Sequence, residues 1–360
     1  MGGNFGHRRR ALQARLSEAH LDALVITGRA NWYYLTGFTG ESGVLIVSRR
    51  GTALITDGRF TTQAREESPS VRMIPQKGSA FESAGAFLKG SAGKRIGFDP
   101  TQVTVAQLRT LRNAAGPRCR WAQAPGLVEA LRMRKDREEI ARMGAAAMLA
   151  GNVMKGAIQL LKPGIREIEV AAEIEYQMRR NGASGPAFET IVAFGRRSAL
   201  PHARPTAKRL GKNELVVLDL GAILAHYCSD ITRTVFFGRA PARVKKWYLA
   251  VLEAQTAAIA AVRNGATCGD VDAAARQVLR GYGLERHFVH STGHGLGLEV
   301  HEDPRVARGQ KKRLEPGNVI TIEPGIYVPG VGGIRIEDDV AVHAGKTEVL
   351  TRASRDFIEL

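Results

Sequence analysis

The stretch LVVLDLGAILAHYCSDITRTVFFG, residues 215–238, places Asp219 and Asp230 inside two apolar, β-rich runs. Because a short connection joins the runs, we predict that they pair as a hairpin and bring the two carboxylates together. Two like charges that close raise one pKa strongly unless a cation lies between them. Taken singly, Asp219 is more simply a turn cap and Asp230 an exposed side chain, so the prediction depends on further ligands.

Two more carboxylates interrupt apolar runs further along the chain. Glu323 lies in NVITIEPGIYV, residues 318–328, and Glu337 in GGIRIEDDVAV, residues 332–342. An unpaired charge in such a run costs several kcal/mol, so each carboxylate calls for a cation or a proton as its partner. Arg335 precedes Glu337 by two positions and shares its strand face, which favours an orienting role over metal binding.

Histidines are concentrated in HSTGHGLGLEVHED, residues 290–303, which contains His290, His294 and His301. The glycines between them allow the backbone to approach a ligand closely. We expect one imidazole to bind metal through a neutral ring nitrogen and the others to donate hydrogen bonds to substrate. Any one of these histidines taken alone is more often structural than catalytic.

The combined donor set indicates two divalent cations rather than one. Four carboxylates nearly neutralise two such ions and leave the imidazole neutral, and oxygen-rich ligation suits Mn(II), with Zn(II), Co(II) or Ni(II) able to compete. Two metal ions roughly 3.5 to 4 Å apart can activate a water and polarise a carbonyl, so hydrolysis is the predicted reaction class.

The chain is long enough for two domains, and the pattern predicts an α/β (α+β) fold with a boundary after residue 127. Residues 1–127 alternate helix and strand around a predicted loop at 31–43, and residues 128–360 begin with a long helix at 135–161. Residues 161–182 align without gaps on residues 262–283, matching Gly164 with Gly265 and Gly182 with Gly283. This repeat predicts two similar halves around a pseudo-two-fold axis, with a cleft between them.

Composition narrows the class of protein. The formal charge of +17 comes from Arg and Lys scattered through every segment, and aromatics are 6%, so we expect no nucleic-acid partner. No apolar run is long enough to cross a bilayer, and the start of the chain lacks a secretion signal, which predicts a cytoplasmic protein without a membrane association. Three cysteines without CxxC spacing fit a reducing compartment and roles in packing.

Taken together, these motifs resemble the pita-bread metallopeptidases, specifically the Xaa-Pro aminopeptidase and prolidase branch. NWYYLTGFTG, residues 31–40, and LITDGRFTTQA, residues 54–64, resemble the creatinase-type N-terminal domain. The resemblance implies that Asp219 binds one metal and that Asp230 and Glu337 bridge both metals. His294 and Glu323 would complete the coordination shell of the other metal. Glu323 would also carry a proton from the attacking water toward the prolyl nitrogen.

The resemblance also assigns residues around the metals. His202, in SALPHARP at 198–205, together with His290 and His301, would position substrate and stabilise the tetrahedral intermediate, while Tyr227 and Arg335 match supporting positions behind the ligands. It further implies peptides with proline second as substrates and a homodimer, with Trp32 and its neighbours in the loop at 31–43 as candidates to reach a partner's cleft. Packing of Trp32, Tyr33 and Tyr34 within their own domain is the alternative.

Three functions therefore remain open from the sequence. The favoured one is an aminopeptidase that removes the residue before a proline, and a prolidase restricted to Xaa-Pro dipeptides is the close alternative. A non-catalytic binding protein on the same fold is the third, and it predicts lost ligands, whereas all five are present.

Overall fold

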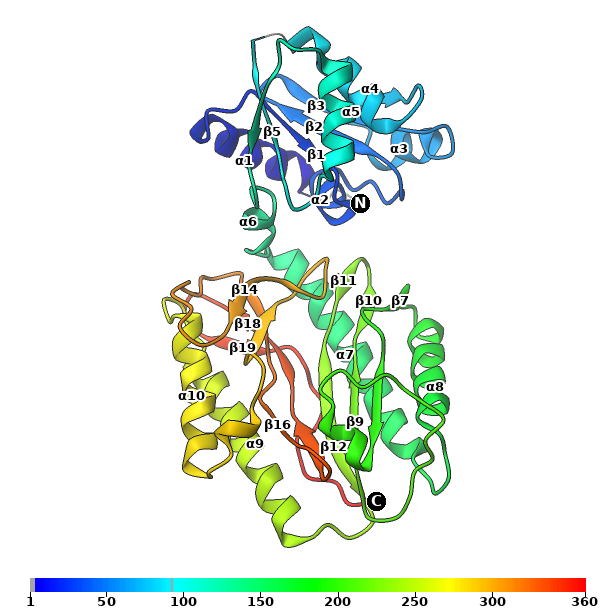
Figure 1. Cartoon of the computed structure of the whole chain (residues 1–360), viewed down its shortest axis with the longest axis vertical. Coiled ribbons are helices and arrows are strands. Elements are labelled where there is room, and N and C mark those ends of the chain that lie inside the picture. Colours follow the sequence, from blue (N-terminus) through cyan, green and yellow to red (C-terminus); the bar gives the residue numbers. More distant parts are fainter. Residues whose placement is uncertain (1–3, 92) are drawn as a thin grey trace. The chain divides into compact units, whose positions relative to one another are not determined.

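The computed structural model describes residues 4–91 and 93–360, and the chain divides into two compact units. The first unit ends at Arg132, and the second is Met133–Leu360 (Figure 1). The division falls after α6 (Glu129–Arg132), later than the sequence boundary at 127, because polar contacts tie this helix to the first unit. Arg132 Nη1 donates to Asn31 Oδ1 at 2.7 Å, and Asn31 Nδ2 donates to Glu129 Oε1 at 2.6 Å.

The first unit is built on a six-stranded mixed sheet with the order β4-β3-β2-β1-β5-β6. Its strands are β1 (Ala23–Ile26), β2 (Val44–Ser48), β3 (Gly51–Thr56), β4 (Arg72–Pro75), β5 (Arg95–Phe98) and β6 (Arg120–Gln123). Its helices besides α6 are α1 (Phe5–Glu18), α2 (Arg29–Thr36), α3 (Thr61–Glu67), α4 (Ala80–Leu88) and α5 (Val105–Ala115), with a 3₁₀ turn η1 (Lys89–Ser91). The antiparallel pairs β1/β2 and β2/β3 stand among parallel pairs, which confirms the predicted α/β character.

The predicted loop at 31–43 is wrong over its first half, because α2 occupies Arg29–Thr36. Apolar packing outweighs the weak local helix signal there, since Trp32, Tyr34 and Leu35 are all buried. The Trp32 ring lies 6.4 Å from the Phe38 ring, and Trp32 is only 4% exposed. Trp32 therefore packs within its own unit, as the alternative predicts.

The second unit contains four helices packed against several small sheets (Figure 1). The helices are α7 (Arg137–Leu160), α8 (Glu167–Arg180), α9 (Ala242–Ala261) and α10 (Cys268–Gly281), with 3₁₀ turns η2 (Gly195–Ala199) and η3 (Glu285–His287). The first-half strands are β7 (Gly185–Pro186), β8 (Ile191–Phe194), β9 (Glu214–Leu220), β10 (Ala222–Leu224), β11 (Tyr227–Cys228) and β12 (Ile231–Phe237). The second-half strands are β13 (Gly293–Gly295), β14 (Glu302–Val306), β15 (Val319–Ile322), β16 (Gly325–Val328), β17 (Gly332–Arg335), β18 (Asp338–Val342) and β19 (Thr347–Val349).

The sheets of the second unit have the orders β12-β9-β8, β14-β13-β15-β18-β19, β11-β10-β7 and β16-β17. The first of these packs with α7 and α8 over one hydrophobic cluster, and the second packs with α9 and α10 over another. A backbone hydrogen bond from Glu337 N to Thr232 O, 3.2 Å long, joins the two halves at the centre of the unit.

The predicted duplication is confirmed by matching hydrogen bonds before α8 and α10. Gly164 N donates to Leu210 O at 2.9 Å, and Gly265 N donates to Leu314 O at 2.8 Å. The same two glycine carbonyls each accept a guanidinium hydrogen bond, from Arg209 at 2.9 Å and from Arg313 at 2.7 Å. Both helices also end before a glycine with positive φ, Gly182 or Gly283, a backbone conformation that glycine adopts without a Cβ penalty.

Among the described residues, no helix combines the length and the apolar character that crossing a membrane requires. The three cysteines are unpaired and buried.

Candidate metal centre

The hairpin predicted around Asp219 and Asp230 is confirmed. Strand β9 pairs antiparallel with β12, with Thr232 opposite Asp219, and Asp230 directly precedes β12. Both carboxylates are nearly buried, with 7% of Asp219 and 5% of Asp230 exposed. The alternative of an exposed Asp230 is therefore wrong, and two acidic groups stand side by side beneath the surface.

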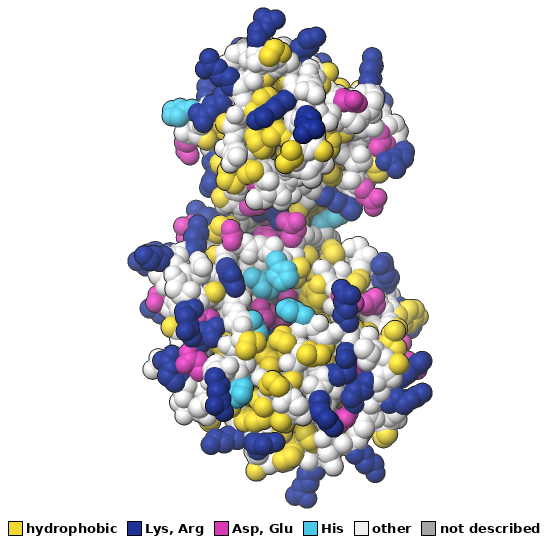
Figure 2. Space-filling model, in the orientation of Figure 1, with side chains coloured by type: hydrophobic (Ala, Val, Ile, Leu, Met, Phe, Trp, Pro, Cys, Tyr) yellow, Lys and Arg dark blue, Asp and Glu magenta, His cyan; other side chains and the backbone are white. Residues whose placement is uncertain are grey.

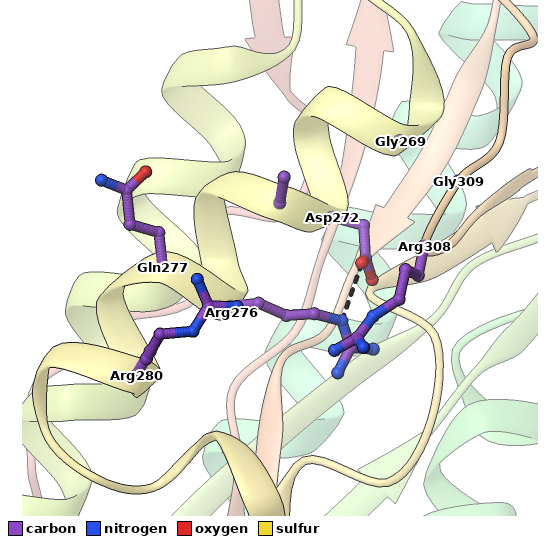
Figure 3. A pocket seen from close by; sticks show the side chains of 8 residues that line it. Gly269, Asp272, Arg276, Gln277, Arg280, Arg308 and Gly309 are labelled. Carbon is purple, nitrogen blue, oxygen red and sulfur yellow. Dashed lines mark hydrogen bonds and ion pairs between the residues drawn. The ribbon is translucent and has the colours of Figure 1, made fainter.

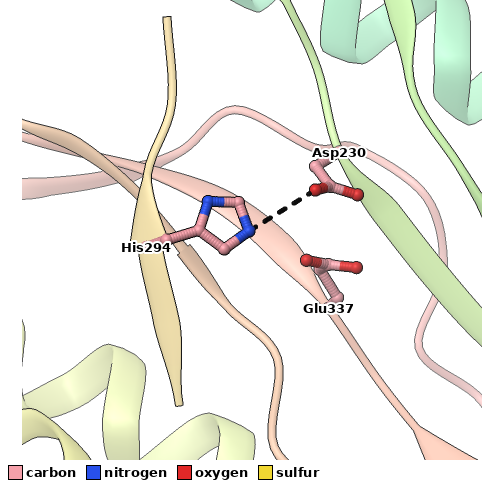
Figure 4. A group of neighbouring side chains, drawn as sticks. All are labelled: Asp230, His294 and Glu337. Atoms are coloured by element: carbon pink, nitrogen blue, oxygen red, sulfur yellow. Dashed lines mark ion pairs between the residues drawn. The ribbon is translucent and has the colours of Figure 1, made fainter. Parts of the chain in front are cut away.

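Asp230, His294 and Glu337 point toward one another from three separate segments of chain (Figure 4). One donor atom from each of the three lies within 4.8 Å of the others. His294 comes from β13 in a Gly-rich turn, and its Nε2 is 3.7 Å from Asp230 Oδ2. Its Nδ1 lies 2.9 Å from the Gly295 carbonyl oxygen, which fixes the ring and leaves Nε2 facing the carboxylates.

Glu323 follows β15 and extends the same cluster. Its Oε1 lies 3.5 Å from His294 Nε2, and its Oε2 lies 4.0 Å from His290 Nδ1. The Glu323 backbone N–H donates to the Thr292 carbonyl at 2.8 Å, which ties the end of β15 to the histidine segment. The two halves of the unit therefore contribute to one cluster, with Asp219 and Asp230 from the first and the remaining candidate ligands from the second.

Arg335 lies behind the carboxylates, as its position on the strand predicts. Its Nη2 donates to Asp219 Oδ2 at 2.5 Å, and its Nε donates to Thr232 Oγ1 at 3.0 Å. Thr232 in turn donates to Glu337 Oε2 at 2.6 Å, so one guanidinium orients two of the candidate ligands. Only 3% of Arg335 is exposed, and a buried cation here is stabilised by the surrounding carboxylates.

The histidines lie beside the cluster, and Figure 2 shows histidine and acidic side chains gathered on one face of the second unit. His290 Nε2 lies 2.9 Å from the Tyr327 hydroxyl, and the His301 ring stands edge-on to His294 at 4.4 Å. His202 is exposed, and burial, with a smaller contribution from nearby His202, lowers the pKa of both His290 and His301. The three predicted substrate-side histidines therefore surround the same place.

Tyr227 lies in β11, where its buried hydroxyl donates to Glu139 Oε1 at 2.9 Å on α7. This contact fixes the strand that leads into Asp230.

Three polar residues at the centre escaped the sequence prediction. Tyr327 accepts a hydrogen bond from Arg335 Nη1 at 2.5 Å while its hydroxyl also contacts His290. Asp339 Oδ2 accepts the Asp230 backbone N–H at 3.1 Å, and Thr232 links Arg335 to Glu337. Thr232 was detectable, because it follows Asp230 by two positions and shares its face, whereas Tyr327 is brought near His290 only by tertiary packing.

Burial dominates the electrostatics of the cluster. It raises the pKa of Asp230 and of Glu337 well above their ordinary values, with neighbouring carboxylates adding to the effect. It raises the pKa of Glu323 to about 7, although the Arg335 charge acts in the opposite direction. The same burial lowers the pKa of His294 to about 4, so its imidazole is neutral at pH 7 and able to bind a metal.

The donor set fits divalent cations. Asp219 Oδ1 and Asp230 Oδ1 are buried and have no hydrogen-bond partner among the described residues. Unsatisfied buried carboxylate oxygens are costly, and a cation between them would satisfy both. The neutral imidazole and the four carboxylates complete a set of oxygen and nitrogen donors that suits a hard or borderline metal.

Comparison with known proteins agrees with this geometry. Residues 141–344 match the model of metallopeptidase family M24, and residues 8–134 match that of the creatinase/prolidase N-terminal domain. An Xaa-Pro dipeptidase of Pyrococcus horikoshii is 38% identical over 94% of this chain and 95% of its own length. Two solved structures superpose closely: an Xaa-Pro dipeptidase from Bacillus anthracis (TM-score 0.95, 36% identity, 99% of this chain and 100% of that one) and an X-Pro aminopeptidase from Thermotoga maritima (TM-score 0.87, 36% identity, 96% and 100%).

Proposed function

Since this chain belongs to metallopeptidase family M24, we propose that it hydrolyses the peptide bond between an N-terminal residue and a following proline. The observation that carries the proposal is the cluster of Asp219, Asp230, His294, Glu323 and Glu337, which the two halves bring together where they join. Relatives named as Xaa-Pro dipeptidase and X-Pro aminopeptidase support the choice of substrate.

Two divalent cations would be held by these five side chains. Asp219, Asp230, Glu323 and Glu337 would supply carboxylate oxygens to the ions, and His294 would supply a neutral ring nitrogen. When bound, the metal pair would polarise the attacked carbonyl as a Lewis acid. It would also lower the pKa of a bound water, so that hydroxide is available at neutral pH. Mn(II) is our choice because the donors are mostly oxygens, and Co(II) or Zn(II) are the substitutes to test.

Glu323 is suited to moving the proton. Its carboxyl lies between His294 and His290, and burial raises its pKa to about 7 in the metal-free protein. A carboxylate held beside the metal ions can accept a proton from the attacking water and deliver it to the prolyl nitrogen. That nitrogen must be protonated to leave, because an amine anion is a very poor leaving group.

The histidines would act on the substrate. His290 and His301 flank the cluster, and His202 stands on its exposed side, so each can act on a substrate carbonyl or its tetrahedral intermediate. The two ring nitrogens of His290 contact the Ser291 carbonyl and the Tyr327 hydroxyl, so His290 would exchange its Tyr327 contact for one with the substrate. Arg335 would keep Asp219 oriented, and Tyr227 would support the strand leading into Asp230.

Two substrate lengths are candidates. We favour an aminopeptidase acting on peptides with proline second, and a dipeptidase restricted to Xaa-Pro is the second candidate because that activity is named for the Pyrococcus and Bacillus relatives. We also propose a cytoplasmic homodimer without a nucleic-acid partner, in keeping with the scattered surface charge.

The test begins with metal-stripped protein reloaded with Mn(II). Release of the first amino acid is followed from a proline-second tripeptide and from the matching Xaa-Pro dipeptide, with Glu323→Ala as the inactive control. Cleavage of the tripeptide establishes an aminopeptidase, and cleavage of the dipeptide alone establishes a prolidase. No cleavage of either with Mn(II), Co(II) or Zn(II) would reject the catalytic proposal and favour a binding protein on this fold.

A further inference from the structure

A buried ion pair lies on α10, outside the candidate ligand set. Arg276 Nε donates to Asp272 Oδ2 at 2.7 Å, one helical turn apart, as Figure 3 shows. The Asp272 side chain is 1% exposed and that of Arg276 is 12% exposed. Desolvating such a pair is costly, so further hydrogen bonds must satisfy its remaining donors and acceptors.

Those further hydrogen bonds all go to the segment that carries His290. Arg276 Nη2 donates to the His290 carbonyl at 2.7 Å, and Nη1 donates to the Phe288 carbonyl at 3.2 Å. The guanidinium carbon also lies 4.3 Å from the centre of the Phe288 ring. On the other side, Thr292 Oγ1 donates to Asp272 Oδ1 at 2.8 Å. The pair therefore holds the backbone before, at and after His290.

The held segment leads directly into the metal centre. The His290 ring contacts the Tyr327 hydroxyl at 2.9 Å, and the Thr292 carbonyl accepts the Glu323 backbone N–H at 2.8 Å. A shift of this segment would move the His290 ring away from Tyr327. Misplacement of a catalytic group by about 1 Å can cost on the order of a hundredfold in rate.

We infer that Asp272 and Arg276 are positioning residues that fix His290 for its role on the substrate, an inference that rests on the proposed function. Neither side chain needs to touch the substrate. Arginine suits this task because its planar, five-donor guanidinium can contact a carboxylate and two carbonyls at once, which a lysine ammonium on a flexible chain cannot do with the same geometry.

The surroundings of Arg276 make the test practical. Its outer side borders a hollow of about 460 Å³ that is also lined by Gln277, Arg280 and Arg308 (Figure 3). A shorter, polar side chain at this position can therefore be hydrated instead of leaving a sealed cavity. Arg280, one turn further along α10, pairs with Glu285 at the surface and provides a matched control.

The first experiment compares Arg276→Gln, Arg276→Lys and Arg280→Gln in the metal-loaded enzyme. We expect Arg276→Gln to lower kcat by about 10- to 100-fold, the effect typical of supporting groups behind a catalytic centre, with an unchanged metal content. Arg276→Lys should recover little of that loss, and Arg280→Gln should stay within about twofold of wild type. Wild-type kcat in Arg276→Gln would overturn the inference.

A double-mutant cycle with His290→Ala separates positioning from general destabilisation. If Arg276 acts through His290, Arg276→Gln should change kcat less than about twofold once His290 is absent. An equal loss of kcat in both backgrounds would show that Arg276 does not act through His290.

A spectroscopic readout keeps the inference testable if no Xaa-Pro peptide is cleaved. In Zn(II)-loaded protein with labelled histidines, the His290 ring signals are identified by their absence from His290→Gln. We expect Arg276→Gln to shift these signals and Arg280→Gln to leave them in place. Unmoved His290 signals in Arg276→Gln would reject the inference independently of activity, whereas a wild-type enzyme without peptidase activity would reject only the proposed function.

Discussion

Helix α8 in the first half and helix α10 in the second half are entered through the same backbone hydrogen bonds, yet their first residues are Glu167 and Cys268. Glu167 is fully buried and accepts hydrogen bonds from Arg197, Phe194 and Thr206. Cys268 is equally buried, but it packs in an apolar cluster where burial raises the pKa of its thiol to about 11.

This difference teaches that the duplicated backbone and the side chains it carries are specified separately. The framework repeats because its glycines and helix ends satisfy the same backbone groups in both halves. The candidate metal ligands do not repeat, since the first half supplies two aspartates and the second supplies a histidine and two glutamates. The site is thus a product of both halves, and it should fail when either one is altered.

The largest expected effect comes from removing one ligand from each half in turn. Asp230→Asn and His294→Ala should each lower kcat/KM by on the order of a thousandfold and reduce bound metal, because neither half completes the site alone. Metal analysis and peptide assays check this, with Glu253→Gln on the exposed face of α9 as control. Near-normal metal content and activity in either ligand variant would contradict a site shared between the halves.

The second largest effect is expected on stability, at the matched first residues of α8 and α10, Glu167 and Cys268. Glu167→Ala leaves Arg197 without its buried carboxylate and two backbone N–H groups without an acceptor, so we expect a loss of about 3–5 kcal/mol in the free energy of unfolding. Cys268→Ala removes one sulfur atom from an apolar cluster and should cost about 1 kcal/mol. Urea unfolding of both variants measures the difference. Equal losses in the free energy of unfolding would mean that the buried Glu167 carboxylate contributes no more to stability than the Cys268 thiol.

The carboxylates from both halves should make metal binding depend on pH. Burial raises the pKa of Glu323 to about 7, so this group holds a proton at pH 6 that the metal must displace, and it is mostly ionised at pH 8. Metal affinity should therefore rise by about tenfold between pH 6 and pH 8 from this group, with Asp230 and Glu337 adding to the trend. Calorimetry in buffers of different ionisation enthalpy measures the released protons, and proton-free binding at pH 6 would refute this explanation.

The smallest expected effect tests the equivalence of the two frameworks. Arg209 and Arg313 each donate to the carbonyl of a glycine, Gly164 or Gly265, at the entry to α8 or α10. Replacing either arginine with alanine should cost about 0.5–1.5 kcal/mol, because both hydrogen bonds are solvent-exposed. Losses that differ by more than about 1 kcal/mol would show that the matching bonds do not have matching roles.

Much of this arrangement could be predicted from the sequence, because strand periodicity and glycine placement are local signals. The β9/β12 hairpin and the duplicated helices followed from them. Helix α2 could not be predicted in this way, because its local helix propensity is weak and buried aromatic side chains stabilise it. Tyr327 and Asp339 were also missed, because their roles arise from contacts between segments distant in the sequence that no periodicity reveals.

The most direct measurement of the central claim is the number of Mn(II) ions bound by metal-stripped wild-type protein at saturation, counted together with the return of peptidase activity. Ligands from both halves predict two ions per chain, with activity rising as they bind. Saturation at one ion, or no specific binding at all, would contradict a paired metal centre built by the two halves together.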